Sequence, residues 1–442
     1  MEEPDDRRPP QEVMLERLRL KEIGPVADTT FEFHPRMNVI TGDNGLGKSI
    51  ALDAAWYALT RTWPAAWPGR GLIPTEDGAL LEWVDSTSLP PNARQTFSYQ
   101  FGEGLWKNDT QVSGGPSNTL VVYARVDGGF SVSDPLRTGE EFRRPFRVPA
   151  LGRSSCFHFR PSEVWEGLKL DREPGGALVS QGLVHDWLHW AFEPDGTTFE
   201  QLSAIVSSLS PAEPLRALKK GQRVYVDDAR DFPVLATAGG EVPIIHASAA
   251  VRRILGLAYV LVWTWREHST AARLRKVQPL DQLVLLVDEV ENHLHPRWQR
   301  LILPALLEAQ RQLSESLAVQ TIVTTHSPLV LASLEPTFEE EHDQLLHLTV
   351  NEDNRAEVVP LPWVRQGDVV NWLVSESFGL QQGRSVEAEK AIEAAEAFMR
   401  GEATALPPNL NTRGAIHAEL LRLLPDHDHF WPRWIVANRD TP

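Results

Sequence analysis

The chain has 442 residues, of which 42% are hydrophobic, enough to build a sizeable core in one large domain or about two to three ordinary ones. Its formal net charge of −17 at pH 7 opposes binding to a phosphate polymer over the whole surface, so any DNA contact must be local. The single cysteine, Cys156, excludes an internal disulfide framework and a multi-cysteine metal site. Its apolar runs are too short to cross a bilayer, which predicts a cytoplasmic protein without a membrane contact.

The first part of the chain predicts strands followed by a helix. Residues 1–11 are polar and contain prolines, so we expect them to be disordered. Residues 13–20 alternate apolar and charged side chains, as an exposed edge strand does, and residues 29–33 repeat the pattern. Residues 37–41 read as a buried strand that runs into glycines, and residues 50–59, rich in Ala and Leu, as a helix.

Residues 62–242 have a different character, which predicts an inserted lobe. Short β-like runs, such as 96–101 and 119–125, alternate with Pro, Gly, Asp and Asn turns up to about residue 151. Short helical stretches, such as 181–190 and 199–209, follow them. The lobe is therefore expected to be β-rich first and mixed later.

Residues 243–360 predict an α/β succession. A helix over 248–267, a very apolar strand over 282–287, a helix after Pro296, a strand over 319–324 and a helix after Ser327 alternate along the chain. Such an alternation is typical of a mostly parallel sheet covered by helices on both faces. The remaining residues, 361–442, predict a helical C-terminal region, in which Ser385 begins the clearest helix over 386–400.

A phosphate-binding loop is the most specific motif. It lies between the predicted strand and helix, as its chemistry requires, and consists of Gly42, Asp43, Asn44, Gly45, Leu46, Gly47, Lys48 and Ser49. Its glycines let backbone N–H groups converge on phosphates, Lys48 reaches the β and γ oxygens, and Ser49 ligates Mg²⁺. A glycine-rich turn without this role is the alternative. The motif predicts ATP and Mg²⁺ as ligands.

Two adjacent carboxylates end the predicted strand over 282–287. A buried strand that ends in an acid places it at the carboxyl edge of the sheet, beside the phosphate-binding loop. We expect Asp288 to hold Mg²⁺ and Glu289 to act as the base that orients the attacking water. A helix-capping or solvated pair of acids is the alternative.

His326 follows the next predicted strand and is a candidate catalytic residue. The sequence Thr-Thr-His-Ser-Pro over residues 324–328 places a polar histidine at the same sheet edge, where it can sense the γ-phosphate.

These motifs resemble the ATP-binding-cassette heads of the RecF, chromosome-maintenance (SMC) and OLD-like ATPases. Residues 288–296, Asp-Glu-Val-Glu-Asn-His-Leu-His-Pro, resemble most the short bacterial ATPases of that group, in which this segment is the dimer-contacting D-loop. The resemblance covers residues 12–61 and 243–360, the two halves of an ATPase head.

The resemblance implies that heads pair, with a serine-containing signature helix of one subunit completing the loop of the other. Ser248 is the candidate for that role, although alanines stand where the family has glycines. An N-capping serine on a core helix is the alternative. The family's Q-loop glutamine has no clear counterpart; residues 159–165 are its expected location.

Two further polar clusters carry weaker signals. The tail sequence Asp-His-Asp-His over 426–429 has ligand types that suit a divalent metal, with a solvated loop as the alternative. Residues 227–231 form an acidic run that we interpret as a loop.

The motifs and the resemblance lead to one main functional hypothesis. They imply an ATPase that self-associates, as a dimer or larger assembly, and regulates a separately encoded effector, a nuclease, as in anti-phage systems such as Septu or PARIS. The alternative is a RecF-like DNA repair ATPase, which the acidic composition does not favour. A self-sufficient nuclease that uses the 426–429 cluster is a third hypothesis, and a transporter cassette a fourth.

Overall fold

The computed structural model describes residues 13–64, 72, 74, 78–87, 91–110, 116–138, 156–169, 178–375, 377–378, 383–402 and 406–437. They belong to two compact units, the first ending at Gly367 and the second beginning at Asp368. The segment 1–11, predicted to be disordered, lies outside the described residues.

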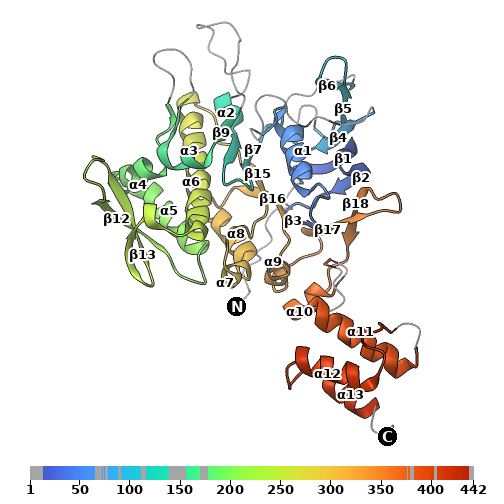
Figure 1. Cartoon of the computed structure of the whole chain (residues 1–442). Helices are drawn as coiled ribbons and strands as arrows, with labels where there is room; N and C mark the ends of the chain where they lie inside the picture. Colours follow the sequence, from blue (N-terminus) through green and yellow to red (C-terminus); the bar gives the residue numbers. More distant parts are fainter. Residues whose placement is uncertain are drawn as a thin grey trace, which may run out of the picture. The chain divides into compact units, whose positions relative to one another are not determined.

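The first unit is built on a 13-stranded sheet with a parallel centre (Figure 1). In spatial order, its parallel strands are β17 (Asp343–Val350), β3 (Met37–Gly42), β16 (Ala318–Thr324), β15 (Gln282–Val287) and β7 (Leu120–Ala124). Nearly every residue of β3, β7, β15 and β16 is buried, as expected for strands covered on both faces.

Further strands extend this sheet on both sides. On the β17 side these are β18 (Ala356–Leu361), β2 (Val26–Glu32), β1 (Leu15–Ile23), β4 (Leu80–Asp85), β5 (Gln95–Gln100) and β6 (Leu105–Asn108). Beyond β7 come β8 (Phe130–Ser133) and β9 (Phe157–Phe159).

Two sequence-based expectations differ from this arrangement. The strand expected at the sheet edge, β1, is an inner strand, because β4 pairs with its other side. Residues 62–242 do not form one separate lobe, because β4 to β9 belong to the main sheet. The alternation of apolar and charged residues could not reveal the inner position of β1. A strand with one polar face has the same pattern at the edge of a sheet and between two antiparallel neighbours.

Helices cover the sheet. α1 (Lys48–Thr60) packs against β1, β3, β4, β7, β15 and β16, and α8 (Ile302–Arg311) packs against α9 (Pro328–Leu334). The long α6 (Ala249–Arg275) contacts α2 (Pro135–Thr138), α3 (Pro161–Glu166) and α5 (Thr197–Ser208), and lies beside β9 in Figure 1. α7 (Pro296–Gln299) precedes α8. These helices close the apolar faces of the central strands.

Smaller elements lie on the α6 side. α4 (Leu183–Ala191) and α5 contact a three-stranded sheet of β12 (Arg216–Arg223), β13 (Asp231–Thr237) and β14 (Gly240–Pro243). The short pair β10 (Leu168–Lys169) and β11 (Leu178–Ser180) and the 3₁₀ turn η2 (Ile244–His246) complete this region.

The second unit is helical. Its helices are α10 (Val369–Leu373), α11 (Val386–Arg400), α12 (Arg413–Leu423) and α13 (Phe430–Ala437). A core that includes Ile392, Leu420 and Trp434 joins α11, α12 and α13, and Ser385 caps α11 through a bond from the Ala388 amide. The helix expected over 386–400 is therefore present, with the cap that the sequence indicated.

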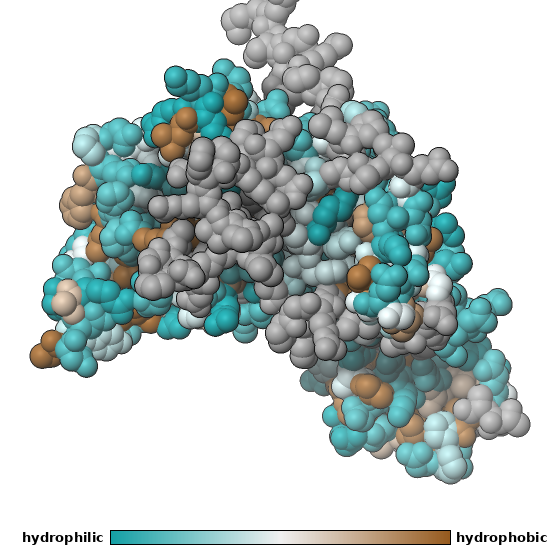
Figure 2. Space-filling model, turned by 90° about the horizontal axis from the view of Figure 1, so that it is seen from above, coloured by the Kyte–Doolittle hydropathy of each residue, from teal (hydrophilic) through white to brown (hydrophobic). Residues whose placement is uncertain are grey.

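On the face shown in Figure 2, described residues are largely hydrophilic, with apolar ones in small separate areas. Exposed large apolar side chains, such as Phe192 and Leu274, are scattered along the sequence. Isolated exposures of this kind are normal for a folded protein and do not by themselves mark an interface.

A buried glutamine joins the first strand to the centre of the sheet. The Gln320 side chain on β16 accepts a hydrogen bond from the Leu15 amide (2.8 Å) and donates to the Leu15 and His34 carbonyls (both 3.0 Å). It is fully buried, so these groups have no access to water as a substitute.

We predict that Gln320→Leu lowers the free energy of unfolding by about 2–4 kcal/mol, because it removes the side-chain partner of the Leu15 amide and carbonyl in the core. The His34 carbonyl loses one bond and keeps the one from Asn38. Urea unfolding of the whole chain measures the change. Gln312→Leu, at an exposed position after α8, is the control and should change stability little. Equal stabilities of the two variants would contradict this role.

Candidate functional site

The glycine-rich loop connects β3 to α1 and has the backbone geometry of a phosphate cradle. Gly42, Gly45 and Gly47 have φ angles of 136°, 80° and 96°, which residues with side chains rarely adopt. A Cβ on Gly42 would lie 2.3 Å from the Leu348 carbonyl oxygen of β17, so only glycine fits there. Because the first amides of α1 lack partners within the helix, this loop presents donors to an anion.

Lys48 is the cation of this loop. Its Nζ donates to the Gly42 carbonyl (2.8 Å) and the Asp43 carbonyl (2.7 Å), and the residue is buried. Burial lowers the pKa of Lys48, whereas the charges of Glu289, Asp43, Asp288 and Glu291 oppose this shift. The ammonium thus lies within electrostatic reach of the acids that end β15. The other loop residues and Ser49 lie along the same turn, with Asp43, Asn44, Gly45 and Ser49 exposed and Leu46 half-buried.

The parallel register brings the acidic strand end next to Thr324. Val287 pairs with Val323, so Asp288 and Thr324 follow side by side. The Thr324 hydroxyl donates to Asp288 Oδ1 (2.6 Å) and accepts from the Glu289 amide (2.8 Å). Asp288 is 1% exposed, whereas the Glu289 side chain is 37% exposed and has a φ of 45°. One acid is therefore fixed inside and its neighbour turns toward solvent.

His326 lies beside Glu289. Its Nε2 is 4.0 Å from Glu289 Oε1, and burial together with the Lys48 charge lowers the pKa of His326 below its ordinary value. The imidazole is therefore neutral at pH 7 and can accept or donate a hydrogen bond.

Glu291 holds the loop that carries His326. Its Oε1 accepts from the His326 amide (2.6 Å) and its Oε2 from the Thr325 hydroxyl (2.8 Å). The sequence hypothesis gave Glu291 no individual role. Its position two residues after Glu289, inside the acidic segment, was the available signal.

On the side of β15 away from β16, Asp288 lies next to the end of β7. The Asp288 amide donates to the Ala124 carbonyl (2.9 Å), and Arg125 follows. Buried Arg125 donates to the Ser131 hydroxyl (3.0 Å) and the Phe159 carbonyl (3.2 Å). Residues 159–165, the expected Q-loop location, instead form the end of β9 and the helix α3. Sequence reasoning missed Arg125, because only the pairing of β7 with β15 reveals its place.

The start of α6 approaches the acidic strand end through an arginine. Arg253 donates to the Arg125 carbonyl (2.7 Å) and to the Asp288 carbonyl (3.3 Å). Ser248 caps the helix, since its hydroxyl accepts from the Val251 amide (3.3 Å). The hydrogen bond of Ser248 is thus the N-cap bond expected under the alternative reading, and its neighbourhood is a pocket of about 480 Å³ lined by Arg252, His293 and others.

The donor set suits a magnesium–nucleotide pair. The Ser49 hydroxyl and the Asp288 carboxylate are hard oxygen donors of the kind that Mg²⁺ prefers. Thr324 occupies one oxygen of Asp288, and the loop amides with Lys48 suit a polyphosphate.

The tail cluster does not form a comparable site. Asp428 Oδ1 accepts from Arg384 (2.7 Å) and from the Phe430 amide (2.8 Å). Within the described ranges, no group of three or more His, Cys, Asp or Glu side chains is placed to hold a metal ion. The solvated-loop interpretation of residues 426–429 fits this better than the metal interpretation.

A half-buried acid on α1, Asp53, pairs with a tyrosine of β7. Asp53 Oδ1 accepts from the Tyr123 hydroxyl of β7 (3.1 Å). Burial raises the pKa of the Asp53 carboxyl to about 7, and the Asp288 charge adds to the shift, whereas the Tyr123 bond and Arg125 oppose it. The sequence gave no signal for this pair.

We predict that Asp53→Asn stabilises the fold more at pH 8 than at pH 6. The folded chain binds the Asp53 proton more tightly than the unfolded chain does. The contribution of this group to the free energy of unfolding is therefore fully present below pH 3.8 and is lost as the pH rises through about 7. Asparagine cannot ionise and keeps an acceptor for Tyr123. The advantage of the variant should be greater at pH 8 by about 1 kcal/mol in urea unfolding. Exposed Asp109→Asn is the control; an advantage independent of pH would contradict the assignment.

Two protein families match parts of this chain. Residues 194–332 match a family described as "AAA domain, putative AbiEii toxin, Type IV TA system", and residues 17–73 match a second AAA domain family. The chain is 26% identical over 391 residues to the Septu protein PtuA of Bacillus thuringiensis, covering 84% of this chain and 86% of that protein. A probable ATPase of retron Ec83 from Escherichia coli is 42% identical over 60 residues, 13% of this chain and 10% of the retron protein.

The identity of this chain to solved structures is low. The SMC head domain from Thermotoga maritima is 16% identical, with a TM-score of 0.34, and the match covers 79% of this chain and 100% of that one. The recombination mediator RecF with ATP is 12% identical, with a TM-score of 0.38, over 80% of this chain and 99% of that one. Among the described residues, no helix combines the length and the apolar character needed to span a bilayer.

Proposed function

We propose that this chain, an ABC/SMC-like AAA ATPase, binds ATP with Mg²⁺ at the edge formed by β3, β15 and β16 and hydrolyses it. The observation that carries the proposal is the convergence of Lys48, Asp288, Glu289 and His326 at one sheet edge.

Each residue has a role that its surroundings support. Lys48 and the loop amides hold the β and γ phosphates, while Ser49 and Asp288 supply oxygen ligands for the metal. Bound Mg²⁺ would neutralise charge on the phosphate oxygens. Glu289, whose side chain is 37% exposed, orients the attacking water and accepts its proton, and neutral His326 contacts the γ-phosphate.

A second copy of the chain completes the site in this proposal. Ser248 begins α6 at an exposed position, and His293 of the segment after Glu289 lines the same pocket as Arg252. The amide-bearing start of α6 is therefore available to meet phosphates bound by another copy. The acidic segment 288–296 would lie between the two copies as a D-loop.

The biological role we propose is anti-phage defence in the cytoplasm. Similarity to the Septu protein PtuA extends over most of both chains, which favours a regulatory ATPase over a transporter cassette. ATP-driven pairing of heads would control a separately encoded effector, a nuclease.

We predict that Lys48→Ala abolishes ATP binding, because it removes the buried ammonium from the loop. Glu289→Gln should keep binding, lower the rate of hydrolysis by about two to four orders of magnitude and trap a larger assembly with ATP. Calorimetry, phosphate release and light scattering measure these effects. Exposed Lys107→Ala is the matched control. Wild-type turnover by Glu289→Gln would contradict the assignment of the base.

We predict that a tagged chain, purified from its native host after phage challenge, brings down a second gene product with nuclease activity. Glu289→Gln, held in the ATP-bound assembly, should change the amount of this partner, whereas Lys48→Ala should not respond to ATP. Mass spectrometry identifies the partner. A complex that contains this chain alone, with ATPase activity stimulated by DNA, would instead support the repair hypothesis.

A further inference from the structure

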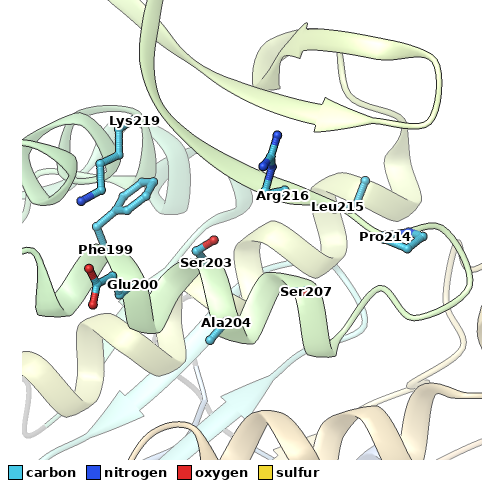
Figure 3. Close-up of a pocket in the computed structure, with 9 residues that line it drawn as sticks. All are labelled: Phe199, Glu200, Ser203, Ala204, Ser207, Pro214, Leu215, Arg216 and Lys219. Carbon is cyan, nitrogen blue, oxygen red and sulfur yellow. The ribbon is translucent and has the colours of Figure 1, made fainter.

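A groove lies between α5 and the beginning of β12, away from the residues of the ATP site. Figure 3 shows the side chains that line it, and its volume is about 460 Å³. One wall is the exposed face of α5, and the other is the segment from Pro214 to Lys219.

The groove is hollow because α5 carries small residues on its outer face. Glu200, Ser203, Ala204 and Ser207 follow one another at helical spacing on that face. On the inner side, Leu202, Ile205 and Val206 are buried, whereas Phe199, also buried, lines the groove. The groove therefore combines polar side chains of α5 with apolar surface from Phe199, Ala204 and Leu215, as in a site for a protruding side chain.

Two cations on β12 border the groove without carboxylate partners. Arg216 and Lys219 are exposed, and no carboxylate of the described chain lies within ion-pair distance of either. The Lys219 ammonium instead lies 5.3 Å from the centre of the Phe199 ring. By contrast, Lys220 pairs with Glu241 and Arg223 with Asp231 on the same strand. Unpaired cations on a chain of net charge −17 form a local site for an acidic ligand.

The groove is held in shape by the ATPase head. Gln201 on α5 donates to the carbonyls of Gln312 (3.0 Å) and Leu313 (2.8 Å), directly after α8. Ser210 accepts from the Leu215 amide (3.1 Å) and donates to the Val206 carbonyl (2.7 Å), which fixes the turn into β12. A preformed groove binds with a smaller ordering cost than a loop that must rearrange.

We propose that this groove binds an acidic segment of a partner protein, with an apolar side chain over Ala204 and Leu215 and carboxylates against Arg216 and Lys219. The proposal rests on the proposed function in one respect, namely that the chain acts on a separate effector. Nucleic acid fits less well, because the groove offers two cations beside the carboxylate of Glu200 rather than a track of cations.

A fluorescein-labelled peptide in which leucines are flanked by glutamates tests the proposal by anisotropy against the full chain. We expect binding that Arg216→Ala with Lys219→Ala weakens by about tenfold. Ser203→Trp, which fills the hollow, should abolish it. Lys220→Ala, on the same strand and paired outside the groove, is the matched control and should bind as the wild type does.

Two further ligands distinguish an acidic-peptide site from a nucleic-acid site. A peptide with lysines in place of the glutamates should not bind, and tighter binding of a labelled oligothymidylate than of the acidic peptide would overturn the proposal in favour of a nucleic-acid site. Absence of any peptide binding to the wild type would also overturn it. The binding assay uses no ATP, and all groove variants should keep the wild-type ATPase rate. Failure of the groove proposal therefore leaves the ATPase proposal intact, and failure of the ATPase proposal leaves the groove proposal intact.

Discussion

The carboxyl ends of β3, β16 and β15 lie level, because these strands pair in parallel with Thr324 opposite Ile40 and Val323 opposite Val287. This register places the phosphate-binding loop, the acidic pair and the His326 loop at one edge. A shift of one residue in β15 would turn Asp288 to the other face of the sheet and separate it from Thr324. Residues 283–287 of β15 are all apolar, so such a shift would cost the core less than the site. The Thr324 bonds therefore favour the register that brings Asp288 and Thr324 together.

The same buried sheet sets the electrostatics of the site. Apolar strands on both sides reduce the local dielectric, so Lys48, Asp53 and Asp288 each bear a desolvation cost unless a partner offsets it. Lys48 has loop carbonyls, Asp288 has Thr324, and Asp53 has only Tyr123. Burial accordingly raises the pKa of the Asp53 carboxyl to about 7. Its neighbour Asp288 is more deeply buried, but the Thr324 hydroxyl donates a hydrogen bond to its carboxylate.

The sequence predicted those features that depend on residues close together in the chain. The loop from Gly42 to Ser49, the strand that ends at Asp288 and the cap Ser385 have signals within a few residues, and the structure has a loop, a strand and a capped helix there. Arg125 and Tyr123 had no such signal, because their position follows from the pairing of β7 with β15, far away in sequence. The inner position of β1 depends likewise on β4, which a strand's own alternation does not report.

Glu291 links two loops that come from different strand ends. Because its carboxylate holds both the His326 amide and the Thr325 hydroxyl, and hydrogen bonds tolerate only a few tenths of an ångström, the segment after Glu289 and the His326 loop must move together or part abruptly. If another copy presses on the segment 288–296, the displacement reaches His326 as a rigid step and not as a gradual drift. In the proposed assembly, the Glu291 carboxylate would therefore couple a contact on the segment 288–296 to the position of His326.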